Sequence, residues 1–160
     1  MRKLIRIVGV PALIIGCTAF AAGPARAGGY VEPKMQHEAY GPVKIVVPIS
    51  SPESKVWVFK LRNIANGLDA AKNGGGELQA EVVVYGPALK MLIDPDAELK
   101  AATDHLRDAG VHITVCNNTL KGMNLDWHEL YKVQEADVVP SGFLEVGWRG
   151  NHGWAVDPMN

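Results

Sequence analysis

The stretch that decides the fold is V-H-I-T-V-C-N-N-T-L, residues 111–120. Its β-branched valine, isoleucine and valine alternate with a histidine and a threonine, which is the period-two pattern of a short strand. The Asn-Asn-Thr that follows favours a turn, so Cys116 is predicted where a strand gives way to a loop. In a sheet flanked by helices, ligands and reactive groups collect at the carboxyl ends of the strands. Cys116 is therefore a candidate functional thiol.

Segments typical of strands and helices alternate on both sides of this stretch. Compact apolar runs predict strands over residues 44–50, 78–85, 137–139 and 154–156. Helical spacing or composition predicts helices over residues 52–73, 88–93, 97–109, 126–135 and 142–148. Strict alternation requires right-handed crossovers and a mostly parallel sheet. The predicted fold class is therefore α/β, a three-layer α/β/α domain with helices on both faces of the sheet.

Several helix starts are marked by capping residues. Ser51 followed by Pro52 is typical of an N-cap with proline at the first helical position. Asp94 followed by Pro95 repeats this signal before the next long helix, and Ser141 is placed to cap the helix that begins at residue 142. These residues fix where the chain is expected to turn from loop to helix.

The first 27 residues are typical of a secretory signal peptide. Basic residues at 2, 3 and 6 precede an apolar run over 7–22, and Ala25-Arg26-Ala27 forms an A-x-A cleavage signal. We therefore expect a periplasmic or secreted protein cleaved near Ala27. The alternative is a lipoprotein anchored through Cys17, which ends a lipobox-like I-I-G-C. Residues 28–42 are expected to form an extended arm, and residues 43–160 a single domain.

Composition narrows the classes of function. Cleavage near Ala27 removes four basic residues and no acidic one, which leaves 12 basic against 17 acidic residues and a net charge of −5. No basic stripe is evident, so nucleic acid is not expected as a partner. With Cys17 removed, Cys116 is the only cysteine, and an intramolecular disulfide is excluded. The thiol is then free, masked or shared with another chain.

Other catalytic and binding motifs are missing or weak. The five histidines show no metal-ligand spacing, so neither a metal nor a cofactor is expected. The sequence has no G-x-S-x-G elbow of a hydrolase and no dinucleotide fingerprint after the first strand. Gly86 and the run Pro140, Ser141 and Gly142 follow predicted strands and precede predicted helices. They either border a small-molecule pocket or form ordinary turns.

The order of several segments resembles the DsrE/DsrF-like family of sulfur-relay proteins. The matching segments are K-I-V-V (44–47), L-R-N-I-A-N (61–66), E-V-V-V-Y-G-P-A (81–88), L-R-D-A-G-V-H-I-T-V-C-N-N-T-L (106–120) and V-V-P-S-G-F-L-E-V (138–146). This resemblance implies a flavodoxin-like fold, a homo-oligomer and a cysteine that carries a persulfide. Cys116 falls on the position that matches that cysteine. The export signal departs from the family, whose relay members act in the cytoplasm.

Two hypotheses follow for the function. In the first, Cys116 accepts or carries sulfur as a persulfide, supported by the loop residues Asn117, Asn118 and Thr119, with a sulfur donor or acceptor protein as partner. A thiol reacts as the thiolate, so this chemistry needs neighbours that lower its pKa. In the second, the protein is a non-catalytic oligomeric module that binds a small molecule or protein, and Cys116 is a buried structural residue.

The aromatic tail predicts self-association. Apolar and aromatic residues are frequent between residues 143 and 154, and a parallel sheet of this size has two edges to protect. We expect a homo-oligomer, a trimer or larger by family resemblance, with residues 138–154 at the contact between subunits. This segment is also expected to lend residues to the Cys116 site of a neighbouring subunit.

Overall fold

The computed structural model describes residues 34–158. The expected signal peptide, the alternative lipid anchor at Cys17 and most of the expected arm lie outside these residues. The chain forms five strands, four α-helices and three short 3₁₀ helices in this part. They follow the order β1 (Gly41–Ile49), α1 (Ser54–Asn73), β2 (Gly76–Val84), η1 (Gly86–Leu92), α2 (Ala97–Asp108), β3 (His112–Cys116), α3 (Asn117–Met123), η2 (Trp127–Glu129), η3 (Glu135–Asp137), β4 (Val138–Val139), α4 (Gly142–Asn151) and β5 (Ala155–Val156).

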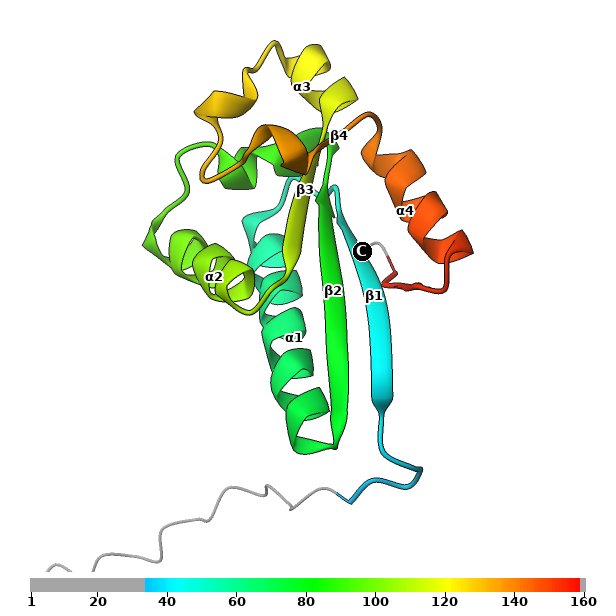
Figure 1. Ribbon diagram of the computed structural model, residues 1–160. Coiled ribbons are helices and arrows are strands. Elements are labelled where there is room, and N and C mark those ends of the chain that lie inside the picture. Colours follow the sequence, from blue (N-terminus) through cyan, green and yellow to red (C-terminus); the bar gives the residue numbers. More distant parts are fainter. Residues whose placement is uncertain (1–33, 159–160) are drawn as a thin grey trace, which may run out of the picture. The chain divides into compact units, whose positions relative to one another are not determined.

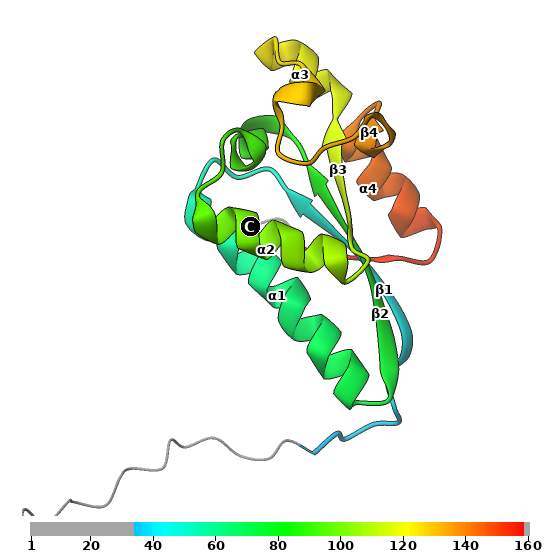
Figure 2. The same cartoon turned by 60° about the vertical axis from the view of Figure 1, so that its left-hand side comes forward.

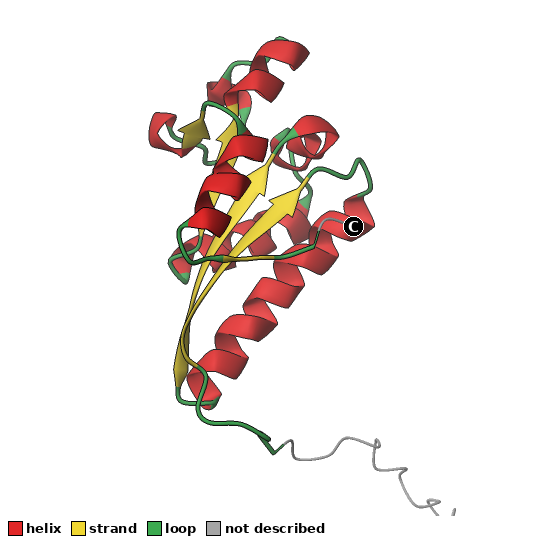
Figure 3. Ribbon diagram, turned by 90° about the vertical axis from the view of Figure 1, so that its right-hand side faces the viewer, coloured by secondary structure: helices red, strands yellow, loops and turns green. Residues whose placement is uncertain are grey.

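The five strands form one parallel sheet in the order β4-β3-β2-β1-β5. α1 and α2 lie on one face and α4 on the other, in two views of the molecule (Figures 1 and 2). This confirms the three-layer α/β/α fold, of the flavodoxin-like kind, that the alternating pattern predicts. The arrowheads of the strands point to the same end of the sheet (Figure 3), so their carboxyl ends share one edge.

The apolar core lies between the sheet and the α1/α2 layer. Residues of β1, β2 and β3 that face this layer, such as Val47, Val82 and Ile113, are almost completely buried against Leu61 of α1 and Leu106 of α2. Each of these large aliphatic side chains contributes about 1.5–3 kcal/mol when it leaves water. This packing fixes the positions of the strands and therefore also the points from which the loops at their carboxyl ends start.

The first two strands begin earlier than expected, at Gly41 and Gly76, which lie opposite each other in the sheet. A Cβ atom on Gly76 would lie 2.6 Å from the carbonyl oxygen of Gly41. Only a glycine permits so close an approach of the two backbones. The signal of a strand is weak at these five early positions because two of them, Pro42 and Glu77, are exposed, and they do not form an apolar run.

Two predicted helix caps were displaced by a few residues. Helix α1 begins at Ser54 with Glu53 at the N-cap position, and the Ser51 hydroxyl accepts a hydrogen bond from the Glu53 N–H at 3.2 Å instead of capping the helix. Helix α2 is capped by Asp96, which accepts from the Leu99 N–H at 2.9 Å, and not by Asp94. In each case the proline lies in the loop before the helix.

Two further expectations around the carboxyl edge were wrong. The Asn-Asn-Thr after Cys116 opens helix α3 directly and does not form a loop. The expected helix over residues 126–135 is replaced by short 3₁₀ turns, because Leu130 bridges to Ile93 and the Tyr131 N–H donates to the Leu92 carbonyl at 2.8 Å. Pairing with a distant segment outweighed the helical composition here.

The last described segment closes the sheet next to β1. Strand β5 pairs with Ile45 and Val46, and the Asp157 N–H donates to the Val46 carbonyl at 2.9 Å. The ammonium of Lys60, only 3% exposed on α1, pairs with the Asp157 carboxylate and donates to the Pro158 carbonyl at 2.6 Å. This ion pair, in which Lys60 is buried and the Asp157 side chain is 32% exposed, attaches the segment to α1. Over residues 34–158, no helix has the length and apolar character needed to cross a membrane.

Candidate functional site

The candidate thiol lies at the carboxyl edge of the sheet, at the end of a central strand. Cys116 is the last residue of β3 and pairs with β4, while the rest of β3 pairs with β2. The last four residues of β3 are buried, and strands pair with β3 on both sides. The Cys116 side chain itself is 5% exposed.

Two helices begin beside this thiol. Cys116 occupies the N-cap position of α3, and Gly142, the first residue of α4, lies against it from the other side. A Cβ atom on Gly142 would lie 3.2 Å from the Cys116 Cβ and 3.1 Å from the Tyr85 Cβ. A glycine at this position therefore lets the backbone of α4 approach the thiol closely. Ser141 caps α4 by accepting from the Leu144 N–H at 3.4 Å, as its sequence predicts.

Burial alone raises the pKa of the Cys116 thiol, but hydrogen bonds from four groups outweigh it. These are the Gly142 backbone, the Thr119 hydroxyl and the backbones of Thr119 and Asn118, and the net pKa lies below its ordinary value. The backbone donors belong to the first turns of α3 and α4. N–H groups directed at a sulfur favour the negative thiolate, which is the reactive form.

The Thr119 hydroxyl also ties the thiol to a third loop. Its Oγ1 accepts a hydrogen bond from the Gly86 N–H at 2.8 Å. Gly86 has a φ of +58°, a left-handed conformation that glycine adopts without strain. With that acceptor site used, the hydroxyl proton is free to point at the sulfur. Gly86, Thr119 and Cys116 thus form a chain of three contacting groups from β2 to β3.

The structure thus places three of the other predicted site residues, Asn118, Thr119 and Gly142, at the Cys116 thiol, and Gly86 contacts Thr119. Asn117 instead contributes to a hollow of about 650 Å³ on the outer side of α3. That hollow also includes Lys121, Asp126 and His128, and the His128 Nδ1 lies 2.5 Å from the Asp126 Oδ1. Pro140 is exposed in the loop between β4 and α4.

A buried ionic cluster beneath α4 is missing from the predicted site. Glu81 of β2 is 1% exposed, and its Oε2 lies 2.6 Å from the Arg149 Nε. The same Nε–H donates to the Glu145 Oε1 at 2.9 Å, and the Thr114 hydroxyl donates to the Glu81 Oε1 at 3.2 Å. A charged residue inside the otherwise apolar run 80–84 was the one signal in the sequence that indicated this cluster.

Burial raises the pKa of Glu81 above its ordinary value. The Arg149 charge opposes this shift and the Glu145 charge adds to it, while the Thr114 hydroxyl and His112 lower the pKa to a smaller degree. Glu81 is therefore a carboxyl group whose ionisation depends on its arginine partner. Within residues 34–158, no three His, Cys, Asp or Glu side chains gather closely enough to hold a metal ion.

Comparison with known proteins supports the fold and adds no function. No family model and no curated protein matches the chain. A solved structure that does match is described as a protein of unknown function, MTH1491, from Methanobacterium thermoautotrophicum. Its TM-score is 0.63 at 24% sequence identity, and the match covers 74% of this chain and 99% of that one. This degree of likeness shows a shared α/β fold.

Proposed function

We propose that this protein is an exported DsrE/DsrF-like sulfur carrier that accepts sulfur as a persulfide on Cys116. The observation that carries the proposal is the geometry at the thiol: Cys116 is the N-cap of α3, and Gly142, the first residue of α4, packs against it. Hydrogen bonding from these first turns lowers the pKa of the thiol against the opposing effect of burial. The resemblance from residue 44 to about residue 156 supports the same role for this cysteine.

The proposed step is a transfer of sulfane sulfur. The Cys116 thiolate attacks the outer sulfur of a donor persulfide, R–S–SH, and forms a new S–S bond. The S–S bond of the donor breaks, and the donor leaves as the thiolate R–S⁻, which takes up a proton. The products are Cys116–S–SH and R–SH, with no net oxidation.

Intact mass after treatment with a persulfide donor tests this proposal. The protein with Cys116 intact should gain the mass of one sulfur atom, and reduction with dithiothreitol should remove it. The Cys116→Ser variant is the control and should gain nothing. Equal labelling of both proteins, or no labelling of the first, would contradict the proposal.

One observation favours the alternative, a non-catalytic oligomeric binding module with a structural cysteine. The Cys116 side chain is only 5% exposed, as expected for an inert buried thiol. Alkylation separates the two functions at low cost. A thiol that reacts with iodoacetamide in the native protein supports sulfur transfer, and one that reacts only after denaturation supports the alternative.

We also propose that α4 mediates the predicted homo-oligomer, because its polarity is inverted. The residues that face the sheet include the charged Glu145 and Arg149, whereas Phe143, Leu144 and Trp148 are 71%, 69% and 49% exposed. A surface helix ordinarily directs its apolar stripe inward. A second copy of this chain that covers the outer stripe would remove this apolar surface from water. In the proposed assembly, this second copy also lies next to Gly142, beside the thiol.

A further inference from the structure

Helix α4 has little apolar area with which to hold the sheet. Its inward positions are Gly142, Glu145, Val146, Arg149 and Gly150, and valine is the only large apolar side chain among them. Packing therefore cannot supply much of the energy that keeps α4 against the strands. Yet this helix presents the Gly142 backbone to the Cys116 sulfur, so its position determines the environment of the thiol.

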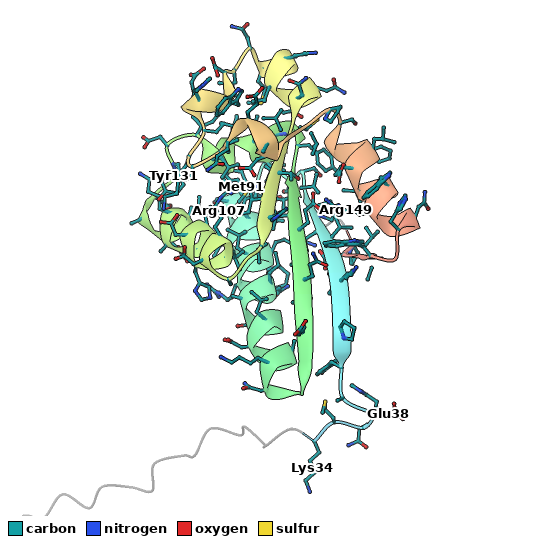
Figure 4. All side chains as sticks on the ribbon, in the orientation of Figure 1. Lys34, Glu38, Met91, Arg107, Tyr131 and Arg149 are labelled. Atoms are coloured by element: carbon teal, nitrogen blue, oxygen red, sulfur yellow. The ribbon has the colours of Figure 1, made fainter. Side chains whose placement is uncertain are left out.

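The guanidinium of Arg149 supplies the missing attachment. It lies between the carboxylates of Glu81 on the sheet and Glu145 on α4 itself, at 2.6 and 2.9 Å (Figure 4 labels Arg149 on the side of α4 toward the sheet). The ring of Trp154 lies 4.9 Å from the Arg149 Cζ, in the range of a cation–π contact. Arg149 is 25% exposed, so these charges interact largely out of water.

The cluster is connected to the thiol through the sheet. Thr114, which donates to Glu81, lies on β3 two residues before Cys116, and alternate residues of a strand share a face. Glu81, Thr114 and Cys116 therefore all lie beneath α4. Arg149 contacts the sheet about two turns along the helix from Gly142. The helix is thus anchored at one end by charge and meets the sulfur at the other.

We infer that Arg149 is a positioning residue, which seats α4 through Glu81 so that the Gly142 N–H points at the Cys116 sulfur. The inference rests on the proposed function only for the use that the cell makes of the thiol. The effect of Arg149 on the position of α4 and on the Cys116 thiol does not depend on sulfur transfer. Glu81 fixes the point of contact on the sheet, and Glu145 pairs with the same guanidinium from α4 itself. Gly142, in the first turn of α4, is the residue that meets the thiol.

The pH dependence of alkylation tests this inference. In Arg149→Met, which keeps the length of the apolar stem, α4 should lose its attachment and Gly142 should move away from the sulfur. We expect the midpoint of the rate-against-pH curve for iodoacetamide to shift upward by about one unit, and the plateau rate at high pH to rise as the thiol becomes accessible. At neutral pH, a shift of one unit corresponds to about tenfold less thiolate.

In Arg149→Lys the upward shift of the midpoint should be smaller than in Arg149→Met. Lysine keeps the positive charge beside the two carboxylates but lacks the planar guanidinium. Arg62→Met is the matched control: Arg62 is 67% exposed on α1 and lies 3.8 Å from Glu98, so its loss should leave the midpoint unchanged. A folded Arg149→Met protein of lower stability with an unchanged midpoint would show a merely structural role and overturn the inference.

If Arg149→Met does not fold, Glu81→Gln decides the question because it keeps the shape of the side chain and leaves Arg149 paired with Glu145. An upward shift of the midpoint supports the inference, and an unchanged midpoint overturns it. Persulfide labelling of the same variants separates this result from the proposed function. A wild-type protein that takes no sulfur, with the midpoint shifted in the variants, would reject sulfur transfer and retain the positioning role.

Discussion

The hydroxyl of Thr119 serves two partners at once, since it accepts from the Gly86 N–H at 2.8 Å and bonds the Cys116 sulfur. Thr119→Val keeps the shape of the side chain and removes both interactions. The unsatisfied Gly86 N–H should cost about 1–2 kcal/mol of stability, and the pKa of the thiol should rise. Alkylation rates followed from pH 6 to 10 should show the curve displaced to higher pH.

Thr119→Ser provides the matched control because it retains the hydroxyl. It should keep the wild-type midpoint of the alkylation curve, with only a small loss from the missing methyl group. Coincident curves for the wild type and Thr119→Val would show that the hydroxyl does not act on the sulfur.

Two glycines of α4 should respond in opposite ways to the same substitution. Gly142→Ala places a methyl group 3.1–3.2 Å from Tyr85 and Cys116, closer than unstrained contact allows. We expect it to destabilise the protein by about 1 kcal/mol or more and to raise the pKa of the thiol. Gly147→Ala meets nothing within 4 Å and should stabilise the helix by about 0.5–1 kcal/mol.

Urea denaturation gives both free energies, and alkylation gives the pKa of the thiol. Equal stability changes for the two alanine variants would show that the close approach of α4 to Cys116 carries no strain. Gly147→Ala also tests whether any change at the sulfur is specific to the first turn of the helix.

Among the elements, the segment that follows α4 is held by its pairing with β1 and by the ion pair between Lys60 and Asp157. Asp157→Ala would leave the Lys60 ammonium buried in α1 without its carboxylate, with the Pro158 carbonyl as its remaining described partner. A buried charge without its counter-ion costs about 3–5 kcal/mol. We therefore expect a large fall in the urea midpoint. The double variant Lys60→Met, Asp157→Ala should recover most of it, because no charge is then left unpaired.

A double variant as unstable as Asp157→Ala would contradict this account, since the loss would then come from the segment itself and not from the uncompensated ammonium. Lys132→Met offers a comparison at the surface. Lys132 is 55% exposed and pairs with Asp104 at 2.7 Å, and such pairs contribute about 0–1 kcal/mol.

The sequence predicted elements with strong local signals and missed those set by distant contacts. The apolar run of β2 and the cap at Ser141 correspond to observed elements, because neighbouring residues determine them. Residues 126–135 have a helical composition, yet pairing of Leu130 with Ile93 prevents the helix. Cys116 was placed correctly at a strand end, but the role of Arg149 depends on Glu81 of another strand, and no local pattern connects the two.

For the molecule as a whole, the exposed apolar stripe on α4 predicts the site of self-association. Replacing Phe143 and Leu144 by serine should dissociate the oligomer while the free energy of unfolding of the monomer changes little, since both side chains are exposed. Light scattering at micromolar concentration measures the mass. Phe59→Ser on α1, where the phenyl ring is 52% exposed, is the control and should leave the assembly intact.

A wild-type protein with the mass of one chain would reject the oligomer. An assembly that survives the serine substitutions would retain the oligomer and remove α4 from its interface. Trp148→Ala and Trp154→Ala are less suited to this purpose, because both rings lie against the Arg149 guanidinium, at 5.2 and 4.9 Å from its Cζ.

The neighbours of β1 imply an order of events during synthesis. One edge of β1 pairs with β2, which leaves the ribosome soon afterwards, but the other pairs with β5, which is made last among the described strands. A nascent chain therefore carries an open edge at Ile45 and Val46 until residues 155 and 156 have been made, and such an edge can pair with other chains. Until β5 is made, this part of β1 stays open to pairing with the strand of another chain.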